Sequence, residues 1–254
     1  MNTLLGTTLM ATALMLGAGS ACAEEIREAR AVDARVSRIK LDGVVDLVLR
    51  QGAKPSLVIA GERADVARVT TRQHGETLEI DTERRNNTVI GRRPKLTAEL
   101  TVPNLAELSS EGVGASTVSG FSGDKLVLTL DGAGAVTLQG NYRNVDARLG
   151  GVGSMTINGG KAERMNLELR GAGQLAVSGQ TRTLRASLAG VGNLDAEKLR
   201  ADSVDLDLTG LGGATVYASA AANLNLSGMG SATVYGNPAQ RKATTDGMGK
   251  VSWR

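Results

Sequence analysis

The sequence predicts an all-β fold, a parallel β-helix (solenoid) of about eight coils with an irregular β cap at its N-terminal end. A Gly-apolar-Gly triplet recurs eight times in the last 143 residues, with 18 to 20 residues between successive triplets. Apolar residues alternate with polar ones on both sides of each triplet, as they do on a strand with one buried face. The links between coils have four to six residues, too short for a crossover helix, so equivalent strands stack in parallel.

Each triplet lies between two strand segments in which every second residue is apolar and points inward. We therefore expect the triplet to turn a corner of the coil. Glycine suits such a corner because it allows positive φ and close backbone approach. The middle residue is always apolar, and we expect it to fill the corner of the core. The corner glycines are Gly112, Gly114, Gly132, Gly134, Gly151, Gly153, Gly171, Gly173, Gly190, Gly192, Gly210, Gly212, Gly228, Gly230, Gly247 and Gly249.

The alternation predicts which side chains meet in neighbouring coils. Inward residues should form files along the solenoid, and we expect Leu167, Leu188 and Leu208 to share one of them. On the outside, stacking places Arg148 beside Glu168. At about 4.8 Å per coil, eight coils make a rod about 40 Å long.

The whole chain divides into three parts. Residues 1–23 are a candidate signal peptide, residues 24–110 the N-terminal cap and first coils, and residues 111–254 the repeat coils of the same domain. Within 24–110 we expect one degenerate coil at 39–49, strands at 56–60, 77–81 and 96–102, and one helical turn at 62–68. The final repeat has Arg241 and Thr245 at inward positions, as expected of a capping repeat.

The N-terminus carries the signs of export. Residues 1–23 have no charged side chain, and an apolar stretch leads to Ala21-Cys22-Ala23, which fits signal-peptidase cleavage after Ala23. Alternatives are a membrane anchor, for which the stretch is short, and lipid modification of Cys22. We therefore expect an exported protein, periplasmic or on the cell surface. Cleavage after Ala23 would leave a mature chain without cysteine, and hence without disulfides or thiolate metal sites.

Composition limits the function classes. The net charge of +3 is small against 55 charged residues, and aromatic residues make up 2% of the chain. Neither feature favours nucleic acid as a partner. The single histidine, His74, has no partner in the sequence for a transition-metal site, and the tandem Gly-Gly-x-Gly-x-Asp pattern of calcium β-rolls is absent. We predict no cofactor, no metal and no transmembrane helix in the mature chain.

The coils also show a resemblance to a known family. The strand–Gly-x-Gly–strand pattern, the Val102-Pro103-Asn104-Leu105 entry and the upstream Gln51-Gly52 turn resemble the head-GIN-domain family, called autotransporter adhesins of bacterial envelopes. The resemblance covers about residues 30–252. It implies a secreted or periplasmic right-handed β-helix and no catalytic residues. No stretch after the coils has the length of a translocator barrel.

Two surfaces are candidate ligand or partner sites. A basic stretch suited to phosphate or sulfate groups of envelope polysaccharide or lipid contains Arg84, Arg85, Arg92, Arg93 and Lys95. A second surface follows the triplets in neighbouring coils and contains Thr215, Tyr217, Thr233 and Tyr235. A solvated loop and ordinary cross-strand pairing are the alternatives for these two sets.

These features favour a non-enzymatic envelope protein, an adhesin-type binding or structural module whose partner is an envelope polysaccharide or protein. The alternative is a β-helical polysaccharide lyase or hydrolase, for which Asp205, Asp207 and Arg185 on one face are the candidate residues. Ice or crystal-surface binding through the broken threonine column is a third hypothesis. The oligomeric state is left open.

Overall fold

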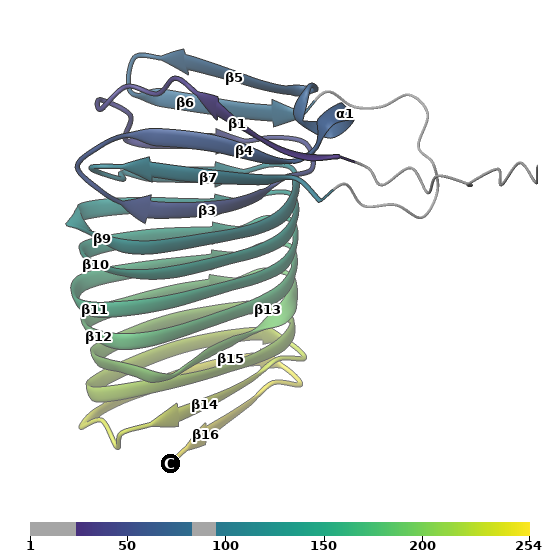
Figure 1. Ribbon diagram of the computed structural model, residues 1–254. Coiled ribbons are helices and arrows are strands. Elements are labelled where there is room, and N and C mark those ends of the chain that lie inside the picture. The colour runs from purple at the N-terminus through teal and green to yellow at the C-terminus, as the bar shows by residue number, and fades with distance from the viewer. Residues whose placement is uncertain (1–23, 83–94) are drawn as a thin grey trace, which may run out of the picture.

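The computed structural model describes residues 24–82 and 95–254, and they form one parallel β-solenoid with about seven turns, close to the eight expected. Figure 1 shows the turns stacked as a ladder, with the N-terminal strands at one end and the C-terminus at the other. The candidate signal peptide, residues 1–23, lies outside the described residues.

The N-terminal part contains eight strands and one helical turn. They are β1 (Glu25–Arg30), β2 (Arg38–Leu41), β3 (Asp46–Gln51), β4 (Ser56–Glu62), α1 (Arg63–Val66), β5 (Val69–His74), β6 (Thr77–Thr82), β7 (Thr97–Val102) and β8 (Glu107–Ser110). The strands and the helical turn expected from the sequence are all present. Strands β1, β5 and β8 were not expected; β1 pairs antiparallel with β4, β5 pairs antiparallel with β6, and β8 pairs in parallel with β2.

The repeats form eight further strands. They are β9 (Val113–Leu130), β10 (Ala133–Leu149), β11 (Val152–Leu169), β12 (Ala172–Leu188), β13 (Val191–Gly228), β14 (Ser231–Tyr235), β15 (Gln240–Gly247) and β16 (Lys250–Trp253). All pairs among them are parallel. Strands β3 and β8 pair in parallel with β9, so the sheet continues from the N-terminal part into the repeats.

The expected links are strand rather than loop. Strand β10 runs without interruption through Gly140–Asn144, the segment expected to be a link. Side chains from this part of the turn enter the core, and Phe121 and Tyr142 are among the most buried residues. The links therefore form a further side of each coil, because their backbone also pairs with neighbouring turns.

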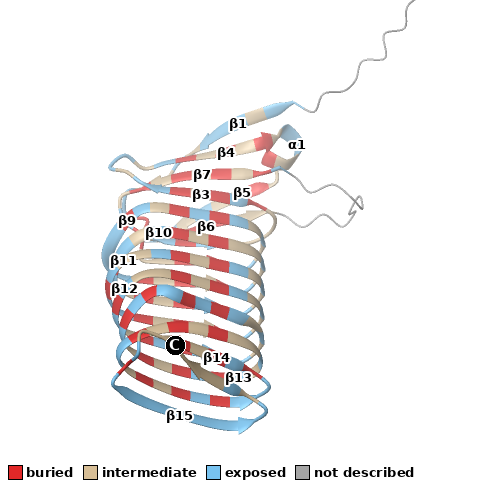
Figure 2. Ribbon diagram, turned by 90° about the horizontal axis from the view of Figure 1, so that it is seen from below, coloured by how far each residue is buried: buried red, intermediate tan, exposed pale blue. Residues whose placement is uncertain are grey.

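Aliphatic side chains fill the interior of the solenoid. In Figure 2 the buried residues recur as bands from one turn to the next. One expected file needs correction: Leu188 aligns with Leu208 and with Leu169, whereas Leu167 aligns with Ala186. The reason is the position relative to the triplet, since Leu169, Leu188 and Leu208 each stand two residues before its first glycine.

The middle residue of the triplet does not fill the core; this prediction was wrong. Alternation continues unbroken through the corner, so both glycines take inward positions and the residue between them points to solvent. Val152 is 62% exposed and Met248 is 79% exposed. The eight middle residues thus form an exposed apolar row along one edge of the solenoid, which we call the ridge. Its members are Val113, Ala133, Val152, Ala172, Val191, Leu211, Met229 and Met248.

The glycines are needed because adjacent turns approach closely at this corner. A Cβ atom on Gly134 would overlap the carbonyl oxygen of Gly114 in the preceding turn, and one on Gly153 would overlap that of Gly134. The amides of the ridge residues then bond between turns, as from Ala133 N to Gly112 O at 2.9 Å. The corner is therefore a backbone ladder with no room for side chains between its turns.

The C-terminal strand β15 is exposed along its whole length. Its inward positions include Arg241 and Thr245, the residues expected in a capping repeat. The Arg241 guanidinium lies 5.5 Å from the Trp253 ring centre, and its Nε bonds Pro238 O at 2.9 Å. These contacts place a charged and an aromatic side chain over the end of the apolar core.

Candidate functional site

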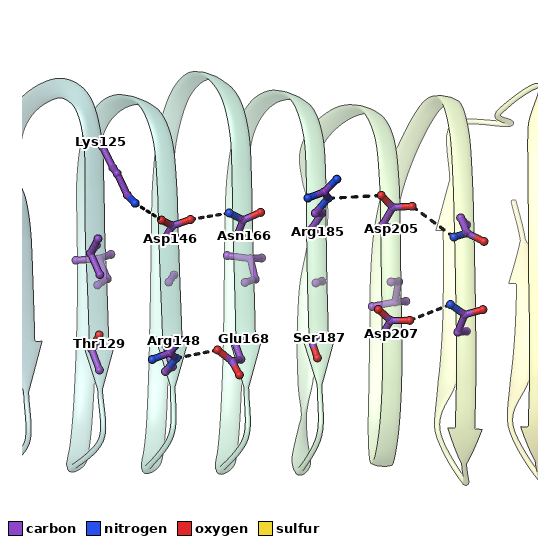
Figure 3. A pocket seen from close by; sticks show the side chains of 18 residues that line it. Lys125, Thr129, Asp146, Arg148, Asn166, Glu168, Arg185, Ser187, Asp205 and Asp207 are labelled. Carbon is purple, nitrogen blue, oxygen red and sulfur yellow. Dashed lines mark hydrogen bonds and ion pairs between the residues drawn. The ribbon is translucent and has the colours of Figure 1, made fainter.

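A hollow of about 840 Å³ lies on the side of the solenoid formed by the strand segments that precede the triplets. Outward side chains at two positions in each turn line it, and their backbones are in register from turn to turn. Figure 3 shows two parallel columns of polar side chains that run across successive turns, and the lining residues extend from Lys125 to Asn225. The walls are polar while the floor is formed by buried residues such as Leu167 and Leu206.

The first column is a chain of paired polar groups. Lys125 Nζ lies 2.9 Å from Asp146 Oδ2, and Asn166 Nδ2 donates to Asp146 Oδ1 at 2.6 Å. Farther along, Arg185 Nε lies 3.8 Å from Asp205 Oδ2, and the amide of Asn223 lies on the other side of that carboxylate at 3.5 Å.

The second column is interrupted by Ser187. Arg148 Nε donates to Glu168 Oε2 at 2.7 Å, the pairing expected from the sequence, and Arg170 also pairs with Glu168. Beyond Ser187, Asn225 Nδ2 donates to Asp207 Oδ1 at 2.9 Å. The Arg185, Asp205 and Asp207 side chains named for an enzyme therefore do lie together in the hollow, but each carboxylate accepts a hydrogen bond or ion pair from the next turn.

Two carboxylates in the hollow are held in the ionised form. Burial opposes ionisation of Asp146, but hydrogen bonds from Lys125 and Asn166 outweigh it and keep the pKa of this carboxyl below its usual value. The hydrogen bond from Arg148 lowers the pKa of Glu168 against a smaller effect of burial. A general acid needs a raised pKa, so these two groups suit binding rather than proton donation.

The second candidate surface lies on the other side of the ridge. Thr215 pairs with Thr233 and Tyr217 with Tyr235 in adjacent strands, so the four residues form one patch. The Arg200 guanidinium lies 4.2 Å from the Tyr217 ring centre, and Arg254 Nη1 lies 3.5 Å from the Tyr235 hydroxyl. Sequence reasoning missed both arginines; Arg200 belongs to the preceding turn, in the segment expected to be a link, and only the folded chain brings it over the ring.

Most of the basic stretch is not among the residues that the structure describes. Arg84, Arg85, Arg92 and Arg93 lie outside the described residues, and Lys95 is an exposed residue just before β7. His74 is exposed at the end of β5. Within residues 24–82 and 95–254 there is no group of three or more metal-ligating side chains, and no helix there is long and apolar enough to cross a membrane.

Comparison with known proteins agrees with this architecture. The sequence model of the family described as "Putative auto-transporter adhesin, head GIN domain" matches residues 36–176 and 160–238. The chain belongs to the head GIN domain family. No curated protein matches the sequence.

Solved structures of this head GIN domain protein's relatives share its fold. A "putative adhesin" from Bacteroides fragilis is 24% identical with a TM-score of 0.68, over 91% of this chain and 97% of that one. A "putative adhesin" from Parabacteroides merdae is 18% identical with a TM-score of 0.81, over 91% and 96%. A "putative lipid binding protein" from Parabacteroides distasonis is 20% identical with a TM-score of 0.80, also over 91% and 96%. At these identities the likeness establishes the fold.

Proposed function

We propose that this head GIN domain protein is exported and acts as a non-enzymatic adhesin-type module whose hollow binds a neutral envelope polysaccharide. The family description and the solved adhesins of the same fold support the adhesin role. The observation that carries the choice of ligand is the internal pairing of the charges in the hollow.

The chemistry of the hollow favours a ligand with many hydroxyls and no charge. Lys125, Arg148 and Arg185 each face a carboxylate. Among the described residues that line the hollow, Asp207, which accepts a hydrogen bond from the Asn225 amide, is the one carboxylate without a basic partner, so the hollow offers no positive excess to an acidic polymer and little negative excess to a basic one. Paired groups keep spare lone pairs and N–H donors, which hydroxyls of a sugar chain can share. The columns repeat every turn, about 4.8 Å, and so present an extended chain with equivalent contacts along its length.

The test is binding of the purified protein to neutral and to acidic polysaccharides on a glycan array and by calorimetry. We expect neutral chains to bind, and the double variant Asn166→Ala/Asn225→Ala to bind about tenfold more weakly, since two amides are lost. Thr137→Ala, outside the hollow, is the matched control. Preference for acidic chains, or equal loss in the control, would contradict the proposal.

A second candidate function is polysaccharide cleavage, favoured by the meeting of Arg185, Asp205 and Asp207 in one hollow. It predicts release of new reducing ends from a polysaccharide, abolished by Asp207→Asn. We expect no release, because Asp207 and Asp205 are engaged by amides and a guanidinium of adjacent turns.

Two candidate surfaces remain. Thr215, Tyr217, Thr233 and Tyr235 are proposed as a further contact surface, for which a protein partner is favoured over a sugar because the Arg200 guanidinium already covers one side of the Tyr217 ring. Arg84, Arg85, Arg92, Arg93 and Lys95 are proposed to hold phosphate or sulfate groups. Replacing the four arginines by serine should weaken binding to sulfated or phosphorylated polymers and leave neutral chains unaffected. Protease shaving of intact cells, compared with fractionated cells, separates a surface location from a periplasmic one.

A further inference from the structure

The ridge borders a side of the solenoid that carries almost no charge. This low-charge face consists of four outward positions in each of seven turns: the ridge residue and the outward residues two, four and six places after it, from Val113 to Tyr235. Of the twenty charged residues between 113 and 235, only Asp195 and Glu197 occupy its outward positions, and the Arg200 guanidinium reaches its border over the Tyr217 ring. The others lie in the hollow, beside the triplets or along the former links.

The ridge residues are more exposed than large aliphatic side chains normally are on a soluble surface. Val191 is 58% exposed, Leu211 46% and Met229 56%. They are not there to fill the corner, since the glycines close it by backbone contact. Neither packing within the coil nor turn geometry requires an apolar side chain at these positions, so a partner surface is the physical reason left for them.

We propose that the low-charge face is a homotypic docking surface. A second copy of this chain packs on it face to face, with the two solenoid axes antiparallel, so that the first turn of one copy meets the last turn of the other. From the strand spacing and rise, the face measures about 30 Å by about 20 Å, or roughly 600 Å². Stable interfaces bury about 800 Å² per partner and weak ones less. The size therefore predicts a reversible dimer with a dissociation constant between about 1 µM and 1 mM.

The residues along the face fit those of a second copy in which the order of turns is reversed. When the two-fold axis runs along the turn that contains Ala172 and Ala176, the ridges of the two copies lie opposite each other. Ala133 then lies opposite Leu211, and Val113 lies opposite Met229. Small side chains thus meet large ones. The same arrangement places Asp195 opposite Thr156, and Glu197 opposite Asn158, so that both acids face hydroxyl or amide donors.

A sugar polymer is the less fitting occupant of this face. The ridge side of the face carries apolar side chains such as Val191 and Leu211, which offer sugar hydroxyls no hydrogen bond, whereas both columns of the hollow carry polar groups. At the other side of the face, the Arg200 guanidinium already covers one side of the Tyr217 ring.

The experiment measures the mass of the purified full chain by sedimentation and light scattering over a range of concentrations. The test variants are Ala176→Arg and Ala176→Glu, at the centre of the face. Each should weaken self-association at least about tenfold, since like charges meet across the axis, and an equimolar mixture of the two should associate again. The control variants Gln180→Arg and Gln180→Glu change an exposed residue of the same turn outside the face and should leave association unchanged.

A second variant tests the ridge itself. Val152→Ser/Val191→Ser changes two exposed residues that oppose each other in the dimer and should weaken association about tenfold with an unchanged thermal midpoint. A chain that stays monomeric up to about 1 mM would overturn the proposal, as would association insensitive to Ala176→Arg or a mixture that fails to associate. Polysaccharide binding in the hollow is measured separately on the same variants, so loss of one property is distinguishable from loss of the other.

Discussion

Arg148 and Glu168 stand twenty residues apart in the sequence and side by side in the fold, with Arg148 Nε donating to Glu168 Oε2 at 2.7 Å. The contact exists because β10 and β11 run parallel and in register, so that one repeat places each residue beside its equivalent in the next turn. The same register arranges the whole hollow and the whole low-charge face.

This pair predicts a small, pH-dependent contribution to stability. The pKa of Glu168 is lowered in the folded state, chiefly by the hydrogen bond from Arg148. Its contribution is therefore present above the ordinary glutamate pKa of 4.5 and is lost as the pH falls below that value. Glu168→Gln should reduce the free energy of unfolding by at most about 1 kcal/mol at pH 7 and by almost nothing near pH 3. Urea unfolding at both pH values measures this, and an equal difference at both would contradict it.

The glycine corner predicts a much larger effect. Gly134→Ala forces a Cβ into the carbonyl oxygen of Gly114, with backbone on both sides of the clash, and should destabilise the protein by more than about 2 kcal/mol. In the control Gly213→Ala, the nearest atom to the new Cβ is Asn193 Oδ1 at 3.2 Å, on a side chain that can move. This control should cost less than about 1 kcal/mol. Similar losses in the two variants would argue against the backbone ladder.

The outward direction of the ridge is tested by a pair of alanine substitutions three residues apart. Leu149→Ala removes a fully buried side chain and should cost about 2–5 kcal/mol. Val152→Ala removes a side chain that is 62% exposed and should cost less than about 0.5 kcal/mol. A large loss for Val152→Ala would restore the view that the middle residue fills the core.

Tyr142 predicts a loss of stability in alkali. Its hydroxyl donates at 2.9 Å to the carbonyl oxygen of Leu105, in the Val-Pro-Asn-Leu entry, and so ties a repeat turn to the segment before β8. Burial raises the pKa of Tyr142, so its contribution is present below the ordinary tyrosine pKa of 10.0 and is lost as the pH rises above it.

The matching substitution is Tyr142→Phe. It should cost about 1–2 kcal/mol at pH 7, because the buried Leu105 carbonyl loses its donor, and it should make unfolding above pH 10 less steep. Thermal unfolding between about pH 7 and pH 11 measures both effects. An unchanged alkaline profile would mean that Tyr142 is not the group responsible.

Much of the fold could be predicted because one period repeats. The spacing of the glycines gave the coil, the parallel register and the neighbours of Arg148, Tyr217 and Thr215. The direction of Val152 could have been predicted as well, since alternation counted through Gly151 and Gly153 places it outside; the error came from treating the triplet as a break. The antiparallel strands β1 and β5 carry no repeat, and the stacking of Arg200 on Tyr217 depends on how the strand bends between them. Neither follows from period or alternation.

The most direct test of the account is a disulfide that forms only in the proposed register. In a Cys22→Ser background, Thr137→Cys/Thr156→Cys joins outward residues paired between β10 and β11, at about the 4.8 Å strand spacing, within the range that a disulfide spans. Thr137→Cys/Asn158→Cys joins the same two strands with an offset of two residues, about 8 Å apart and beyond that range. The account predicts that mass spectrometry under non-reducing conditions finds the bond in the first variant and not in the second; a bond in the second and none in the first would contradict the stacked solenoid on which everything above depends.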